Sequence, residues 1–149
     1  MNKLAKVGLA LSILSTLASS VAHELIRSKD GGVAVMVHIE PDDNPGVGVS
    51  TVWFELTQKG GMTLALSSCT CTLKVYQGAY KAGMKPLQVA KLYVGKEGEG
   101  KGNPNGAVNF PAVGAYTLRI EGKPRTGQNG AGSSFAPFVI EVATRADKK

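Results

Sequence analysis

The chain has 149 residues, including 19 glycines and 7 prolines, and a formal net charge of +6 at pH 7. This length suits one domain with its own hydrophobic core. The positive charges are spread thinly and no basic patch with interleaved aromatic residues is present, which argues against nucleic acid as a partner.

The first 22 residues have the organisation of a secretory signal peptide. Lys3 and Lys6 supply positive charge, an apolar run of about a dozen residues follows, and small side chains lead to Ala22. Such a run is shorter than the ~20 residues that cross a bilayer. The alternative is an uncleaved N-terminal anchor, but no stop-transfer pattern follows. We therefore expect a signal peptide at 1–22 and one domain at 23–149, periplasmic or otherwise extracytoplasmic, with no stable membrane span after cleavage.

Short apolar runs between glycine and proline turns predict an all-β protein. Strands are expected at residues 33–39, 49–57, 62–66, 69–76, 87–94, 107–110, 116–121 and 135–143. Tyr116, near the start of a late strand, is typical of a tyrosine corner. Trp53 and Phe54 are expected in the core, and residues 95–106 in a surface loop. This pattern predicts an immunoglobulin-like β-sandwich of seven or eight strands.

The two histidines, His23 and His38, are the first candidates for chemistry. Cleavage after Ala22 would make His23 the first residue of the mature protein, where the α-amino group and the imidazole can chelate one metal ion. Amine and neutral imidazole suit Cu(II), which binds such sites more tightly than the other common divalent metals. His38 lies on a strand face that it shares with Met36 and Glu40, because alternate strand residues point the same way.

These residues predict a copper site made of His23, His38 and one carboxylate from Glu40, Asp42 or Asp43. The alternative is an incidental N-terminal histidine and a half-exposed strand histidine with no metal between them. The sequence by itself does not bring residues 23 and 38 together, so the fold must do so.

Cys69 and Cys71 form a second group, separated by one residue. In an oxidising compartment two cysteines usually form a disulfide. However, the Cα atoms of extended residues i and i+2 are ~6.6 Å apart, at the far end of the range that a disulfide bridges. Three alternatives stay open: a strained and readily reduced disulfide, two buried thiols, or a dithiolate site for Cu(I).

Catalytic motifs are absent from the sequence. It contains no G-x-S-x-G, no H-E-x-x-H and no phosphate-binding Gly-Lys-Ser/Thr loop. We therefore expect a protein that is not an enzyme.

A family resemblance rests on the order of these segments. A signal that ends at His23, then a strand, a Pro/Asp/Gly loop and the strand VWFELT closed by Gly60 and Gly61, resembles the small periplasmic YtkA-like and CopC-like domains. The late segment PAVGAYTLRIEG…FAPFVIEV is similar to their closing hairpin. The resemblance implies an immunoglobulin-like sandwich associated with copper handling. Only one CopC-like ligand matches, the N-terminal His23, because residues 122–134 lack the Asp and His that the family places there.

Together these features predict an exported, non-catalytic protein that binds or relays copper through a mature N-terminal histidine. The alternative is an interaction or accessory β-sandwich module with no metal, whose partner is another exported or membrane-bound protein. A two-histidine copper monooxygenase is a third hypothesis.

Overall fold

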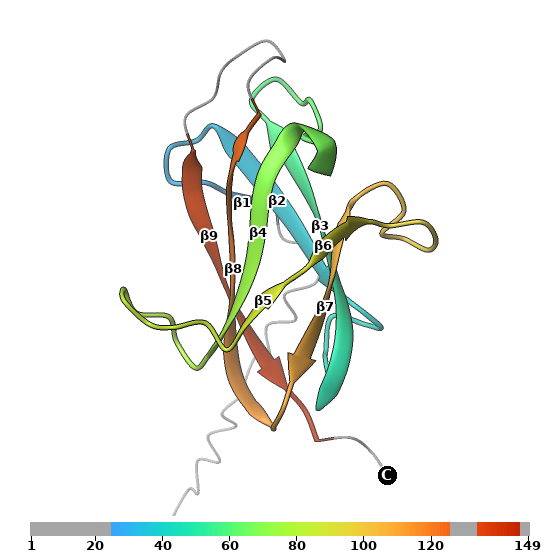
Figure 1. Cartoon of the computed structure of the whole chain (residues 1–149), viewed down its shortest axis with the longest axis vertical. Helices are drawn as coiled ribbons and strands as arrows, with labels where there is room; N and C mark the ends of the chain where they lie inside the picture. Colours follow the sequence, from blue (N-terminus) through green and yellow to red (C-terminus); the bar gives the residue numbers. More distant parts are fainter. Residues whose placement is uncertain (1–24, 126–133, 147–149) are drawn as a thin grey trace, which may run out of the picture.

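The structure, a computed structural model, describes residues 25–125 and 134–146 (Figure 1). The expected signal peptide and His23 lie outside the described residues. The strands are β1 (Ile26–Arg27), β2 (Val33–Ile39), β3 (Gly48–Gln58), β4 (Cys69–Gln77), β5 (Gln88–Ala90), β6 (Leu92–Val94), β7 (Pro104–Phe110), β8 (Gly114–Pro124) and β9 (Phe135–Thr144), with one 3-10 turn, η1 (Leu66–Ser68). The described part is thus all-β. In it, no helix has the length and apolar character needed to cross a membrane.

The strands form two antiparallel sheets that pack face to face. One sheet has the order β1-β2-β3-β7-β6 and the other has the order β5-β4-β8-β9. Leaving β1 aside, these orders match the ABED and C′CFG sheets of an immunoglobulin-type sandwich. The predicted fold class is therefore confirmed (Figure 1).

Two of the predicted strands differ in the structure. Residues 62–66 were expected to form a strand, but they form only a bridge from Thr63 to Thr57 and then enter η1. The expected strand at 87–94 is two strands, because the chain leaves β4 after Ala90 and pairs with β7 from Leu92 onward. A single apolar run can thus serve both sheets, which strand periodicity does not reveal.

The core lies between the two sheets. Its largest fully buried side chains are Tyr116, Phe54, Phe110, Phe138, Leu56, Leu73, Leu118 and Ile120. Burying a large apolar side chain of this kind contributes about 1.5–3 kcal/mol. Phe54 is in this core, as predicted. Trp53 is also buried, as predicted, but it lies on the other face of β3, outside the cluster between the two sheets.

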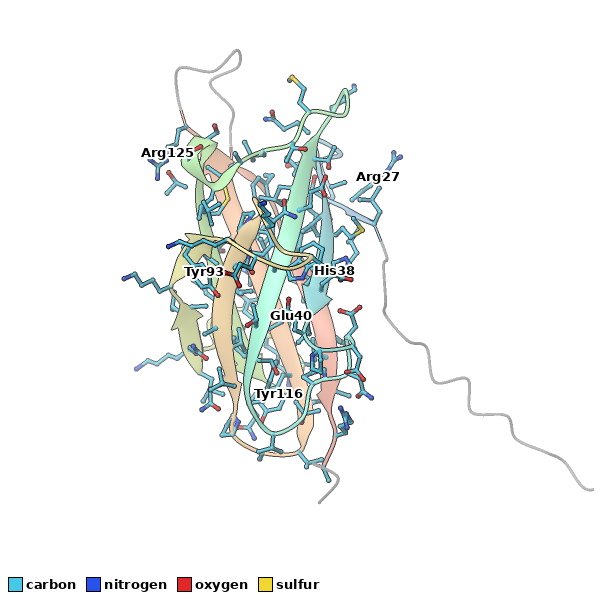
Figure 2. The ribbon with its side chains drawn as sticks, turned by 90° about the vertical axis from the view of Figure 1, so that its right-hand side faces the viewer. Arg27, His38, Glu40, Tyr93, Tyr116 and Arg125 are labelled. Atoms are coloured by element: carbon cyan, nitrogen blue, oxygen red, sulfur yellow. A yellow bond between two sulfur atoms is a disulfide. The ribbon has the colours of Figure 1, made fainter. Side chains whose placement is uncertain are left out.

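The tyrosine corner predicted at Tyr116 is present. The Tyr116 hydroxyl donates a hydrogen bond to the Ala112 carbonyl oxygen at 2.8 Å and accepts one from the Ala112 N–H at 3.1 Å. These two bonds connect β8 to the turn that follows β7 (Figure 2 labels Tyr116).

Replacing Tyr116 with phenylalanine is expected to lower the free energy of unfolding by about 1–3 kcal/mol, because two hydrogen bonds of about 0.5–1.5 kcal/mol each are lost. Urea denaturation measures this difference. Tyr93→Phe is the matched control, because the Tyr93 side chain is exposed. Equal unfolding midpoints for the two variants would show that the corner contributes nothing to stability.

Candidate functional site

A row of aromatic and polar side chains crosses the outer face of the five-stranded sheet. His38 on β2 pairs with Trp53 on β3, Trp53 pairs with Asn105 on β7, and Tyr93 on β6 also pairs with Asn105. Because strand neighbours alternate between faces, these residues point away from the core that Phe54 enters. Yet His38, Trp53 and Asn105 are all buried.

The loop between β6 and β7, residues 95–103, explains this burial. The Asn105 side-chain amide donates hydrogen bonds of 2.9 Å to the carbonyl oxygens of Gly100 and Asn103. A Cβ atom on Gly100 would lie 2.8 Å from Cγ of Trp53, so the loop backbone lies directly on the indole ring. Figure 2 shows the loop crossing β3 between Tyr93 and His38. Residues 95–103 of the predicted surface loop are therefore a cover held in place by Asn105, whereas residues 104–106 belong to β7.

His38 stacks on the Trp53 ring that this loop covers. The ring centroids are 3.9 Å apart, the planes differ by 14°, and His38 is only 6% exposed. Nδ1 of His38 lies 3.5 Å from Oδ2 of Asp43. The half-exposed strand histidine expected from the sequence is thus a buried residue, held between an indole ring and a carboxylate.

Asp43 is positioned by the turn between β2 and β3. Its Oδ1 accepts a 2.6 Å hydrogen bond from the Ile39 N–H, and its backbone φ is +56°. Few residue types adopt this left-handed conformation, and Asp is among them. The turn therefore fixes a carboxylate beside His38.

The other two carboxylates of the predicted site lie apart from Asp43. Asp42 is exposed, with Oδ1 3.9 Å from Nη2 of Arg145. Glu40 is also exposed and lies at the edge of the loop cover, where a Cβ on Gly98 would be 4.0 Å from Oε1 of Glu40. The sequence does not distinguish these three acids, whereas the turn geometry assigns Asp43 to His38.

The described residues do not complete a metal site. In residues 25–125 and 134–146, no three or more His, Cys, Asp and Glu side chains are grouped so that they could hold a metal ion. The described residues do include His38, and the carboxylate of Asp43 lies beside one of its ring nitrogens. A histidine that binds a metal through one nitrogen usually has such a carboxylate beside the other. The copper site predicted from the sequence therefore needs His23, outside the described residues.

Trp53 is a residue of this region that sequence reasoning did not associate with the site. Its indole Nε1 is buried and has no hydrogen-bond partner within the described part of the chain. The sequence does indicate that Trp53 and its neighbour Phe54 point to opposite sides of the sheet, because adjacent strand residues cannot both face the same core.

Cys69 and Cys71 are joined by a disulfide in the second sheet. Their Cα atoms are 5.3 Å apart, closer than in a regular extended strand, and η1 immediately precedes Cys69. Gly122 lies opposite Cys71 on β8, and a Cβ there would be 2.8 Å from the Thr70 carbonyl oxygen and 3.0 Å from the Cys71 sulfur. The cysteines belong to β4, whereas His38 lies in the other sheet.

Comparison of the chain with protein-family models, curated proteins and solved structures found no significant match.

Proposed function

We propose that this protein is an exported, non-catalytic copper-binding protein whose site joins the mature N-terminal His23 to His38. One observation supports this proposal most directly, the register of β1 on β2. Ile26 lies opposite Val35, and Arg27 lies opposite Ala34.

In an antiparallel ladder, each step backward along one strand is a step forward along its partner. Three steps back from Ile26 reach position 23, and three steps forward from Val35 reach position 38. The described ladder ends at Ile26, and its continuation in this register would bring the two histidines opposite each other. Directly opposed residues have Cβ atoms ~4.5–5.5 Å apart, close enough for two imidazoles to bind one ion.

The faces of the strands agree with this pairing. Ile26 packs against the core. Position 23 is an odd number of residues away, so in the same ladder its side chain would point outward. That is the face on which His38 lies.

Asp43 supports the role of His38 as a ligand. A carboxylate beside Nδ1 orients a metal-binding imidazole and raises its basicity. In this proposal Asp43 holds Nδ1 of His38, and copper binds at Nε2. The amine and imidazole of His23 would supply two further nitrogen ligands, and Glu40 is the nearest carboxylate along β2 on the same face. Cu(II) favours such a set of nitrogen and oxygen ligands.

Export is part of the same proposal, because His23 has a free amine only after cleavage following Ala22. The charged, apolar and small-residue segments of the first 22 residues support that cleavage. The compartment is the periplasm or another space outside the cytoplasm.

The chain contains an internal probe for the test. Trp53 is the single tryptophan, and it stacks on His38. Because Cu(II) quenches indole fluorescence at short range, titration of mature protein that starts at His23 should quench Trp53 and saturate at one equivalent. Asp43→Asn should weaken binding by about 10–100-fold.

Two variants test the ligands themselves. One extra alanine before His23 separates the amine from its imidazole without changing the folded residues, so saturable quenching should disappear. The matched control adds one alanine after Lys149 and should bind like the native chain. His38→Gln should also abolish binding, with a thermal melt to verify folding. Equal titrations for the native chain and the N-terminal extension would overturn the proposal and favour the metal-free interaction module.

A further inference from the structure

A hollow of about 290 Å³ opens on the outer face of the five-stranded sheet, at the end away from the turn that carries Asp43. Arg27, Ala34 and Thr57 form one row across β1, β2 and β3. Ala34 has only a methyl group in the middle of this row, which leaves a depression between its neighbours. The volume lies near the lower limit of ligand pockets, ~300 Å³, and suits a small molecule.

Two turns form the rim of the hollow. The turn at Gly31 and Gly32 precedes β2, and the turn at Gly60 and Gly61 follows β3. Gly31, Gly60 and Gly61 have φ values of +70°, +97° and +85°, which favour glycine strongly. Because glycines have no side chains, these turns leave peptide groups accessible at the rim.

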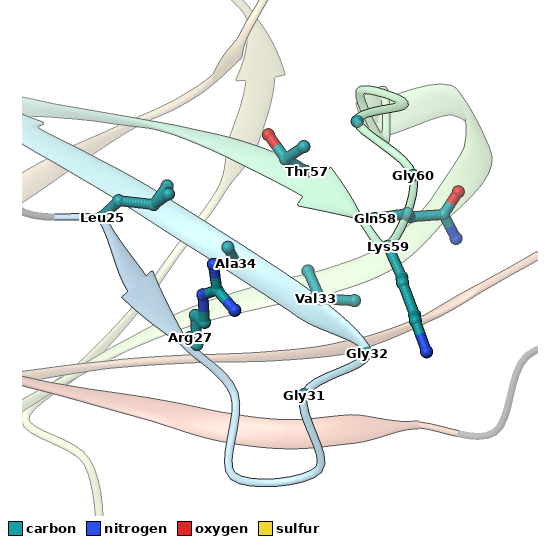
Figure 3. A pocket seen from close by; sticks show the side chains of 11 residues that line it. Leu25, Arg27, Gly31, Gly32, Val33, Ala34, Thr57, Gln58, Lys59 and Gly60 are labelled. Atoms are coloured by element: carbon teal, nitrogen blue, oxygen red, sulfur yellow. The ribbon is translucent and has the colours of Figure 1, made fainter.

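The lining carries two positive charges and no carboxylate. Its charged residues are Arg27 on β1 and Lys59 in the second turn. Figure 3 shows Arg27 on one side of the start of β2 and Lys59 on the other, with Gly31 and Gly32 between them. Neither cation forms an ion pair with a carboxylate of the described residues.

Two acidic residues, Asp30 and Glu55, lie on these elements, but neither forms an ion pair with Arg27 or Lys59. Asp30 lies in the first turn, but its oxygens accept hydrogen bonds from the Ser28 hydroxyl, the Gly32 N–H and, at the start of β9, the Ala136 N–H. These bonds, that of Ser28 foremost, hold the pKa of Asp30 below its ordinary value, so its carboxylate stays charged but is held by these donors and not by Arg27 or Lys59. Glu55 lies two residues before Thr57 on β3 and does not line the hollow.

We propose that this hollow binds a small oxyanion, a phosphate or carboxylate group, through Arg27 and Lys59. A guanidinium forms paired hydrogen bonds to such groups, and an ammonium adds a point charge. The Gly60 N–H supplies a further donor at the rim, since it makes no hydrogen bond within the described part of the chain. This site does not depend on copper.

The test uses metal-free protein, labelled with 15N, and follows amide chemical shifts during two titrations. Inorganic phosphate is the probe in one and succinate in the other, so that the two sources of the anion are distinguished. We expect saturable shifts at Gly31, Gly32, Gly60 and Gly61 with at least one probe. Removing a charged contact should weaken binding by about tenfold.

The double variant Arg27→Gln with Lys59→Gln should therefore show no saturable amide shifts at the probe concentrations that saturate the native chain. The matched control, Lys85→Gln with Lys101→Gln, removes the same charge at exposed positions outside the hollow and should bind normally. The proposal is overturned if neither probe gives saturable shifts. It is also overturned if the control weakens binding as much as the test variant, because net charge would then explain the effect.

Discussion

Replacing Phe54 with alanine is expected to lower the free energy of unfolding by about 3–5 kcal/mol. Its ring is fully buried in β3, the central strand of the five-stranded sheet. Alanine would remove the ring and leave a cavity that the rigid sheets fill only in part. Because a domain of this kind has ~5–15 kcal/mol of stability in total, this one change removes a large fraction of it.

Urea denaturation of the native chain and the variant measures the loss. Val49→Ala is the matched control, because Val49 lies in the same strand and is 74% exposed. The control should differ from the native chain by no more than about 0.5 kcal/mol. A Phe54→Ala midpoint close to that of the control would contradict the packing of the two sheets through this ring.

Phe54 also shows which parts of the fold the sequence predicts well. Alternation along Val33–Ile39 and the apolar character of β3 are local properties, and both strands form close to their expected bounds. The tyrosine corner at Tyr116 has a similarly local signature. Each of these features depends on neighbours a few residues away, so the sandwich can be predicted from one chain.

Features that depend on distant segments are harder to predict. Whether residues 87–94 stay in one sheet depends on the competition between β4 and β7 for the same run. Trp53 is buried because a loop about 45 residues later in the chain covers it, and nothing in the sequence of β3 indicates that loop. Its outward direction could have been inferred from Phe54, but the loop that buries it on that face could not.

The candidate site also combines residues that a local pattern predicts with residues whose position depends on turn geometry and strand register. Strand alternation places His38 and Glu40 on one face, as the sequence predicts. The choice of Asp43 over Asp42 as the neighbour of His38 depends on a single positive φ in the turn. The possible pairing of His23 with His38 depends on the register of β1, which only the two described pairs of that strand establish. A register shifted by one residue would turn the two side chains to opposite faces.

Replacing Gly100 with valine is expected to detach the loop of residues 95–103 from Trp53. A Cβ at this position would lie 2.8 Å from both the Trp53 ring and Oδ1 of Asn105, and a β-branched side chain adds two more carbons. Overpacking of this kind costs about 1–3 kcal/mol, so we expect the loop to move away and expose the ring. The emission of the single tryptophan should then shift to longer wavelength, and the urea midpoint should fall.

Lys101→Val is the matched control, since it introduces the same side chain one residue later, at an exposed position. It should retain the native emission, because its side chain does not enter the space above the indole. Native emission from Gly100→Val would contradict the loop as the cover of Trp53 and would leave the neighbouring strands as the cause of its burial. A red shift in Gly100→Val alone would show that one glycine keeps the loop on the indole ring that stacks on His38.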